Sequence, residues 1–301
     1  MGRAVSVVIP VHNGEHFIRE AVQSALIQEG VEVEVVVVND ASRDNTLNIL
    51  TSITDDRLVT IDLERNVGGA KARNIGVSSA KHDWIAFLDA DDIFLPFKLT
   101  RQIDVLSASN TPSMAATNYW DHRGNLGIAM RGEQIAIGQR EILTKQYDVP
   151  TSGWLLQRRD YEAIGGFTEQ FPRHQDVEML VRYLKFGKVI VLNEPLFSKR
   201  LFGRPAAATV EAALRLYFEQ FGDAINDLSE TDRRRLHARS CARLATLHMN
   251  EGNLASAARQ CWTALVRSPP AACAWLARPL LGRIRAKSSR VVRGKIDRFV
   301  R

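Results

Sequence analysis

The chain has few cysteines and no long apolar run. Its 301 residues include three cysteines, Cys241, Cys261 and Cys273, whose spacing matches no zinc motif and cannot form a complete set of disulfides. No stretch approaches the roughly 18 apolar residues that a membrane-spanning helix needs. The apolar start, Val5 to Val11, contains Pro10 and does not have the form of a signal peptide. These absences predict a protein of a reducing compartment without a membrane span, and therefore a cytoplasmic one.

The fingerprints of several nucleotide and metal sites are also missing. Neither G-x-G-x-x-G nor G-x-x-x-x-G-K-[ST] occurs, which argues against a dehydrogenase-type dinucleotide site and a P-loop. His12 and His16 lie four residues apart, but without a third ligand they do not predict a zinc site. A nucleotidyltransferase would carry a Gly-rich basic loop after its first strand, whereas this chain has Val11-His12-Asn13-Gly14-Glu15.

The net charge of +6 is concentrated at the end of the chain. Residues 282–301 hold eight Lys or Arg and one Asp, a net charge of +7, which leaves residues 1–281 with −1. No nucleic-acid partner is therefore expected. Within 282–301, apolar residues recur at helical intervals, which suggests a basic amphipathic helix in peripheral contact with a membrane; a solvated basic end is an equal alternative. These apolar residues are Ile284, Val291, Val292, Ile296, Phe299 and Val300.

The apolar patterning predicts an α/β fold. A hydrophobic content of 45% and a charged content of 25% are ordinary for a soluble globular protein. Short β-branched runs alternate with helical periodicity, which is typical of βαβ units around a mostly parallel open sheet flanked by helices. We expect strands at Val5–Ile9, Val33–Val38, Leu58–Ile61, Trp84–Leu88, Met114–Asn118 and Lys188–Leu192, and helices at Glu15–Gln28, Thr46–Ile53, Gln139–Lys145, Arg159–Ile164 and Val177–Phe186.

Changes in this pattern predict the domain organisation. Pro195 and the turn at residues 203–205 are expected to end the α/β part, which gives a domain over 1–205 with halves 1–112 and 113–205. Residues 206–281 are Ala- and Leu-rich and predict a helical extension. Within it, Leu244 to Pro270 is similar to a single tetratricopeptide-like helix pair around Gly252. Residues 282–301 form the basic tail.

The strongest chemical signal is an apolar strand that ends in three carboxylates, Phe87-Leu88-Asp89-Ala90-Asp91-Asp92. Residues at the carboxyl end of such a strand face the ligand crevice of an open α/β sheet. Carboxylates packed together are unfavourable unless a cation neutralises them. Mn²⁺ or Mg²⁺ prefers oxygen ligands and commonly shares protein carboxylates with substrate phosphates. The alternative is that Asp91 or Asp92 only caps the helix expected near Leu95.

Other polar residues follow the expected strands and open the expected helices. Asp40 ends the second strand, where it can bind a nucleotide base or ribose, or cap the next helix. The stretch from Asn66 to Gly76 is a Gly-bearing loop that opens a helix; its Lys71 and Arg73 can balance phosphate charge, or the segment is a plain turn. Asp176 heads a helix whose dipole keeps it ionised, which suits a catalytic base and equally suits a cap.

Taken together, these segments resemble the family 2 glycosyltransferases, inverting enzymes with the GT-A nucleotide-diphospho-sugar transferase fold. The resemblance spans Val5 to Arg200. It rests on six ordered motifs: Ser6 to Asn13, Val37 to Ser42, Asn66 to Gly76, Asp89 to Asp92, Gly165-Gly166-Phe167 and Gln175-Asp176.

The resemblance implies roles for individual residues. Asp176 matches the catalytic base, and the D-x-D motif begins at Asp89. Metal ligands are expected at Asp91, Asp92 and Asp89, with Mn²⁺ or Mg²⁺ as the cofactor. The residues expected to bind the nucleotide sugar are Pro10, Val11, His12, Asn13, Glu15, Asp40, Asn66, Gly68, Arg73, Asp89, Ala90 and Asp91.

The resemblance also implies the reaction. A sugar, most often from a UDP-sugar, passes to a hydroxyl of a glycan or lipid-linked acceptor, typically in bacterial cell-envelope polysaccharide synthesis. The chain would act in the cytoplasm or peripherally on the inner face of the plasma membrane. Gln175 stands where many members have Glu. The late histidine of the family is absent, which leaves Lys199, Arg200 or Arg204 to contact the diphosphate. The rival hypothesis is a catalytically silent nucleotide-binding or scaffold protein at the membrane surface.

Overall fold

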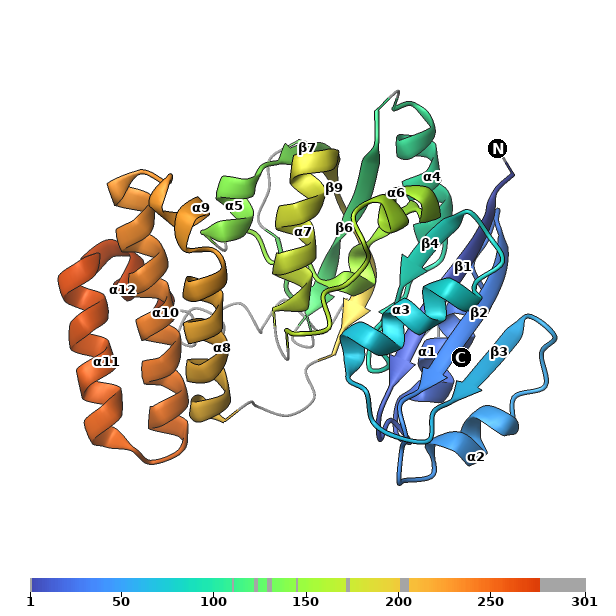
Figure 1. Ribbon diagram of the computed structural model, residues 1–301, viewed down its shortest axis with the longest axis horizontal. Coiled ribbons are helices and arrows are strands. Elements are labelled where there is room, and N and C mark those ends of the chain that lie inside the picture. Colours follow the sequence, from blue (N-terminus) through green and yellow to red (C-terminus); the bar gives the residue numbers. More distant parts are fainter. Residues whose placement is uncertain are drawn as a thin grey trace. The chain divides into compact units, whose positions relative to one another are not determined.

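The computed structural model describes residues 2–276 except 110, 122–123, 129–131, 145, 172–173 and 201–205 (Figure 1). The expected domain boundary near 205 and the basic tail 282–301 lie outside the described residues. The chain divides into two compact units. Among the described residues, one unit contains those of Met1–Gln139 and Tyr147–Phe202, and the other contains those of Arg140–Gln146 and residues 206–276.

The first half of the sheet is parallel, as the sequence predicts. Its strands lie in the order β3-β2-β1-β4. The β-branched runs of β1 and β2 are buried on both faces, which is the pattern of central strands in a parallel sheet covered by helices. Right-handed crossovers place α1 and α3 on opposite faces (Figure 1). The elements are β1 (Ala4–Val11), α1 (Ile18–Leu26), β2 (Glu32–Asn39), α2 (Thr46–Thr51), β3 (Leu58–Asp62), α3 (Gly69–Ser79) and β4 (Trp84–Phe87).

The second half of the sheet is mixed, because β8 pairs antiparallel with both β4 and β6. The path continues β4-β8-β6-β9-β5, and β7 pairs with β9. Three of its strands, β5, β7 and β8, have only two to four residues and give no periodic signal in the sequence. The elements are β5 (Ile93–Phe94), α4 (Lys98–Ser107), β6 (Ser113–Asp121), β7 (Gln134–Ile137), α5 (Gln139–Leu143), η1 (Thr151–Gly153), β8 (Leu155–Gln157), α6 (Arg158–Ala163), α7 (Gln175–Phe186) and β9 (Lys188–Lys199).

The strand that begins at Lys188 is longer than expected. Pro195 does not end it, and β9 continues to Lys199. Pro195 lies opposite Asn118, where the register between β6 and β9 shifts. Proline has no backbone N–H for the ladder, so an irregular position tolerates it. The extension brings the end of β9 to the aspartates that follow β4.

Close packing between α3 and the sheet depends on Gly76. A Cβ at this position would lie 2.4 Å from Val8 Cγ1 and 3.3 Å from Val38 Cγ2. We expect Gly76→Ala to lower the free energy of unfolding by about 1–3 kcal/mol, because the added methyl forces two buried strands apart. Urea unfolding would measure the loss. Gly2→Ala is the control in the same unit, since Gly2 has no heavy atom within 4 Å of an added Cβ; equal stability of the two variants would contradict this account.

The second unit is helical. The predicted helix pair is present as α10 and α11, joined at Gly252, which has a φ of 77°. The short segment Arg140–Gln146 belongs to this unit: Arg140 donates two hydrogen bonds to Asp232, at 2.7 and 2.8 Å. The elements from residue 206 onward are α8 (Ala207–Gln220), α9 (Gly222–Asn226), α10 (Glu230–Asn250), α11 (Leu254–Arg267) and α12 (Pro269–Leu276).

Candidate functional site

The predicted site residues gather at one edge of the sheet. Because β1, β2 and β4 are parallel, their carboxyl ends meet there, and the loops after them carry the residues from Pro10 to Glu15, Asp40 and the aspartate cluster. Pro10 and Val11 are the last residues of β1, and the Val11 side chain is buried in the core. Val11 can therefore offer a ligand only its backbone.

The loops after β1 and β2 are tied together by hydrogen bonds. The Asn13 N–H donates to Ser42 Oγ at 2.9 Å, and Asn13 Oδ1 accepts from the Arg43 N–H at 2.8 Å. Glu15 Oε2 accepts from the Asn45 N–H at 3.0 Å. Asn13 and Glu15 thus hold the rim of the expected nucleoside pocket in shape. The sequence resemblance predicts that Asn13 and Glu15 bind the nucleotide, but it did not predict that they hold the two loops together.

Asp40 fixes a third loop to the same rim. Its side chain is 3% exposed. Its carboxylate accepts hydrogen bonds from the N–H groups of Val67 and Gly68, at 2.6 and 2.9 Å. Asn66 adds a side-chain bond to the Asp40 carbonyl at 3.3 Å. Asp40 therefore orders the loop that leads into α3, and the lone pairs left on its carboxylate are what it can offer a ligand.

We expect Asp40→Asn to lower the free energy of unfolding by about 2–3 kcal/mol. The amide would turn an N–H₂ group toward one of the two backbone donors and leave that partly buried donor without an acceptor. Urea unfolding would measure the difference. Asp56→Asn, at an exposed position, is the control and should change stability by less than about 0.5 kcal/mol. A loss at Asp40 no larger than at Asp56 would show that the two backbone bonds contribute little.

Two of the three clustered aspartates are held by protein donors. Asp89 pairs with Arg73 at 2.6 Å and accepts the Thr151 hydroxyl at 3.0 Å. Asp92 is 2% exposed; it accepts the Ser152 hydroxyl at 2.6 Å and the Arg200 backbone N–H at 2.9 Å. These bonds fix the orientation of both carboxylates.

Asp91 differs from its neighbours. Among the described residues, no side chain donates a hydrogen bond to it. Burial, and then the charge of Asp89, raise the pKa of Asp91 to about 6. Burial, followed by Asp89 and Asp91, raises the pKa of Asp92 well above its usual value. A carboxyl group in such a place gains from a cation, which would lower both pKa values.

The donor set fits Mn²⁺ or Mg²⁺, with Asp91 as the carboxylate free to bind. Both ions prefer oxygen ligands and usually take one or two protein carboxylates together with substrate phosphates. In the part of the chain that the structure describes, no three His, Cys, Asp or Glu side chains are arranged as a complete metal cage. An ion here would therefore depend on oxygens from the substrate.

Arg73 links the aspartates to the start of α7. Its guanidinium donates to Asp89 from one nitrogen and to Gln175 Oε1 from the other, at 2.6 and 3.3 Å. Gln175 is the first residue of α7, and Asp176 is the second. The predicted base therefore lies on the helical turn that Arg73 ties to the D-x-D motif, at a helix N-terminus that stabilises its negative charge.

The Gly165-Gly166-Phe167 motif has a structural explanation. Asn74 accepts from the Phe167 N–H at 3.0 Å and donates to the Phe167 carbonyl at 2.9 Å. Gly165 and Gly166 have φ values of 76° and 65°, which favour glycine. The turn packs Phe167 beneath Arg73, with the guanidinium 5.4 Å from the ring centre. The motif thus supports the residue that bridges the site.

Sequence analysis missed Thr151 and Ser152, which lie in η1 and hold the aspartates. Their only signal is the turn composition of Pro150 to Gly153. Lys199 was proposed for the diphosphate; its ammonium lies 3.2 Å from Asp148 and 5.3 Å from the centre of the Tyr119 ring. Burial acts to lower the pKa of Lys199, but Asp148 and then Asp92 outweigh it and raise that pKa.

The other late-loop candidates have different surroundings. The side chain of Arg200 pairs with Glu20, and its backbone holds Asp92. Arg204 lies outside the described residues.

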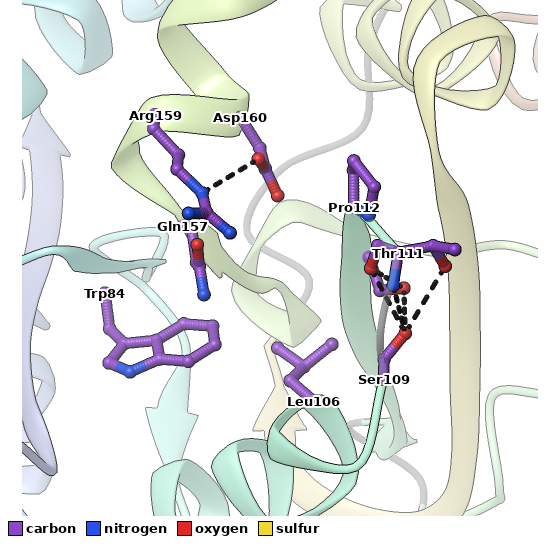
Figure 2. A pocket seen from close by; sticks show the side chains of 9 residues that line it. Trp84, Leu106, Ser109, Thr111, Pro112, Gln157, Arg159 and Asp160 are labelled. Atoms are coloured by element: carbon purple, nitrogen blue, oxygen red, sulfur yellow. Dashed lines mark hydrogen bonds and ion pairs between the residues drawn. The ribbon is translucent and has the colours of Figure 1, made fainter. Parts of the chain in front are cut away.

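A small cavity lies away from this site, beside the amino ends of β4 and β6 (Figure 2). Trp84, Gln157 and Asp160 are among its lining residues, and its volume is about 140 Å³. Ligand pockets usually have about 300–1,000 Å³. This cavity is too small for a nucleotide sugar, and it lies at the opposite ends of the strands from the aspartates.

Comparison with known proteins identifies the family. The sequence profile of "Glycosyl transferase family 2" matches residues 6–165, more than half of the chain. The chain is 45% identical over 105 residues to the "Succinoglycan biosynthesis protein ExoO" of Rhizobium meliloti, covering 35% of this chain and 30% of that protein. It is 34% identical over 199 residues to an "Uncharacterized glycosyltransferase" of Haemophilus influenzae, covering 62% and 74%.

A third relative is the "UDP-Glc:alpha-D-GlcNAc-diphosphoundecaprenol beta-1,3-glucosyltransferase WfaP" of Escherichia coli. It is 34% identical over 116 residues, with 38% of this chain and 46% of that protein covered. The match to the first of the three relatives spans about a third of that protein's length.

Solved structures confirm the fold. S. aureus TarS 1-349 superposes with a TM-score of 0.62 at 19% identity, covering 99% of this chain and 92% of that one. Its complex with UDP gives the same TM-score at 20% identity. The expected GT-A fold with a C-terminal helical region is thus confirmed.

No helix among the described residues is long and apolar enough to cross a membrane. On the profile match, the chain belongs to glycosyl transferase family 2.

Proposed function

We propose that the chain transfers a sugar from a nucleotide-diphosphate sugar to a hydroxyl of a glycan or lipid-linked acceptor, with inversion at the anomeric carbon. The observation that carries this proposal is the chain of contacts Asp89–Arg73–Gln175. These contacts join Asp89 to the first turn of α7, which carries Asp176, and so support the proposal. Family membership and the open sheet edge support the same conclusion.

UDP is the nucleotide named for two of the similar proteins. The Escherichia coli relative is named for a UDP-glucose donor and a diphosphoundecaprenol acceptor, and TarS 1-349 has been solved with UDP-GlcNAc. The Rhizobium relative is named for succinoglycan biosynthesis. We therefore place this chain in cell-envelope polysaccharide synthesis, on the cytoplasmic side. We assign catalysis to 1–205 and treat 206–281 as its helical extension.

In this proposal the nucleoside lies against the tied loops after β1 and β2. Pro10, His12 and Asn13 form one side, and Asp40 with its ordered loop at Asn66 and Gly68 forms the other. Glu15 keeps the first side in position. Asp89 and Ala90 approach the ribose and diphosphate, and Arg73 balances the charge of Asp89 while the donor binds.

Mn²⁺ or Mg²⁺ would be held by Asp91, with Asp92 and Asp89 oriented next to it. When bound, the ion supplies Lewis-acid stabilisation of the leaving diphosphate. The residues of the chain do the rest. Lys199 adds positive charge near the aspartates, and Ser152 and Thr151 keep the carboxylates aligned.

Asp176 is the proposed general base. It removes the proton of the acceptor hydroxyl as that oxygen forms a bond to the anomeric carbon. The bond to the diphosphate oxygen breaks on the opposite face, and the diphosphate leaves with the electron pair. A single displacement of this kind inverts the configuration.

The first test is a thermal-shift screen of nucleotides and nucleotide sugars, each with and without Mn²⁺ or Mg²⁺. We expect metal-dependent stabilisation by one nucleoside diphosphate, and its loss in Asp91→Ala. A folded protein that no nucleotide stabilises would refute the proposal and favour the silent scaffold.

A further inference from the structure

Helix α11 carries an apolar stripe on its outward face. Leu254, Trp262 and Val266 are 70%, 71% and 67% exposed. Together with the exposed Ala258 they are spaced four residues apart, so they lie on one side of the helix. The opposite side, with Ala257 and Ala264, is buried in the helical unit. A surface helix normally turns its polar side outward, and α11 does not.

The charged side chains of α11 are both basic. α11 contains no acidic residue, and its charged side chains are Arg259 and Arg267, both exposed. Arg259 borders the apolar stripe at helical spacing, and an apolar stripe that contains a tryptophan and is bordered by an arginine fits the boundary between lipid headgroups and acyl chains. The arginine stem can lie along the apolar surface while the guanidinium group reaches phosphate.

A second copy of the chain is a weaker fit for the same surface. A 14-residue helix is about 21 Å long, and a strip about 10 Å wide offers roughly 200 Å². Stable protein interfaces need about 800 Å² from each partner. A lipid surface does not require a large matching area, because insertion of a few apolar side chains and attraction to anionic headgroups act together.

We propose that the outward face of α11 docks on an anionic lipid bilayer, with Leu254, Trp262 and Val266 inserted among the lipids and Arg259 against the headgroups. This surface belongs to the helical unit, whereas the candidate site belongs to the other unit. It holds whether or not the proposed transfer reaction is correct.

Flotation of the full chain with vesicles tests this proposal. Phosphatidylcholine vesicles with about a quarter phosphatidylglycerol should bind the wild type better than phosphatidylcholine alone. The double variant Trp262→Gln, Val266→Gln should bind the anionic vesicles about tenfold less. Ile27→Gln is the matched control: Ile27 is 55% exposed on the other unit, so its replacement should leave binding unchanged. Since these side chains are exposed, the variants should keep the circular dichroism of the wild type.

Two outcomes would overturn the proposal. The first is equal vesicle binding by the wild type and the double variant, which would assign any attachment to the basic residues 282–301. The second is a wild type that does not bind vesicles; sedimentation showing a dimer lost in the double variant would then identify a second copy as the partner. Tryptophan emission adds a readout, since the wild type should shift to the blue on binding and Trp262→Phe should not.

Discussion

Asp176→Asn is expected to lower kcat by about 10³-fold, while nucleotide binding stays within about twofold of the wild type. The asparagine keeps the shape of the side chain but cannot accept the proton of the acceptor hydroxyl. General-base catalysis contributes a factor of about 10²–10⁴ to the rate. The other carboxylate in the first turn of α7, Glu178, is buried and cannot replace Asp176. Release of nucleoside diphosphate with saturating acceptor measures kcat.

Glu169→Gln is the control for Asp176→Asn. Glu169 is an exposed carboxylate paired with Lys71 at 3.2 Å. Glu169→Gln removes one negative charge, as Asp176→Asn does. Because an exposed ion pair contributes little, this replacement should lower kcat by less than about threefold. If Asp176→Asn and Glu169→Gln have similar rates, the base is elsewhere and the role given to Asp176 is wrong.

Asp91→Asn is expected to weaken metal-dependent binding of nucleoside diphosphate by about 100-fold. A neutral amide is a poorer ligand for Mg²⁺ or Mn²⁺, and Asp91 is the clustered carboxylate to which no side chain in the described part of the chain donates a hydrogen bond. Isothermal titration with Mn²⁺ and nucleotide measures the loss. Asp56→Asn again serves as the control, with no expected change.

The raised pKa of Asp91 gives the same site a pH dependence. Only the ionised carboxylate binds metal, so a cation must displace a proton below the pKa of about 6. Apparent Mn²⁺ affinity of the wild type should therefore be level above pH 6 and fall about tenfold per pH unit below it. In Asp91→Asn this dependence should vanish. A variant that keeps both the metal requirement and the pH dependence would show that Asp91 is not the ligand.

Local patterns explain what the sequence could predict. The β-branched runs of β1 and β2 and the carboxylates after β4 are signals within single segments, so the parallel half of the sheet and the aspartate cluster were predicted. The support of those carboxylates is non-local. Thr151 reaches Asp89 across 62 residues, and Arg200 reaches Asp92 across 108. The periodicity of a single segment cannot predict a hydrogen bond between residues so far apart in the sequence.

The roles of Asp40 and Pro195 also depend on contacts with distant segments, which the sequence does not reveal. Asp40 was predicted at the right edge, but its carboxylate binds the backbone of the loop before α3, which only the folded chain brings near. Pro195 was predicted to end the sheet domain. A proline stops a regular ladder, but here the register of β6 and β9 is already broken at this position, so the strand continues.

The strand order also limits how this enzyme can be recombined with others. Although β5 belongs to the first 112 residues, it pairs with β9, on the far side of the strands that the later residues supply. β4 in turn pairs with β8. A chimera joined near residue 112 would inherit two foreign pairings, and exchange of donor specificity by swapping the first half alone should yield unpaired, aggregation-prone strands. Donor preference is better redesigned by grafting loops onto the intact sheet.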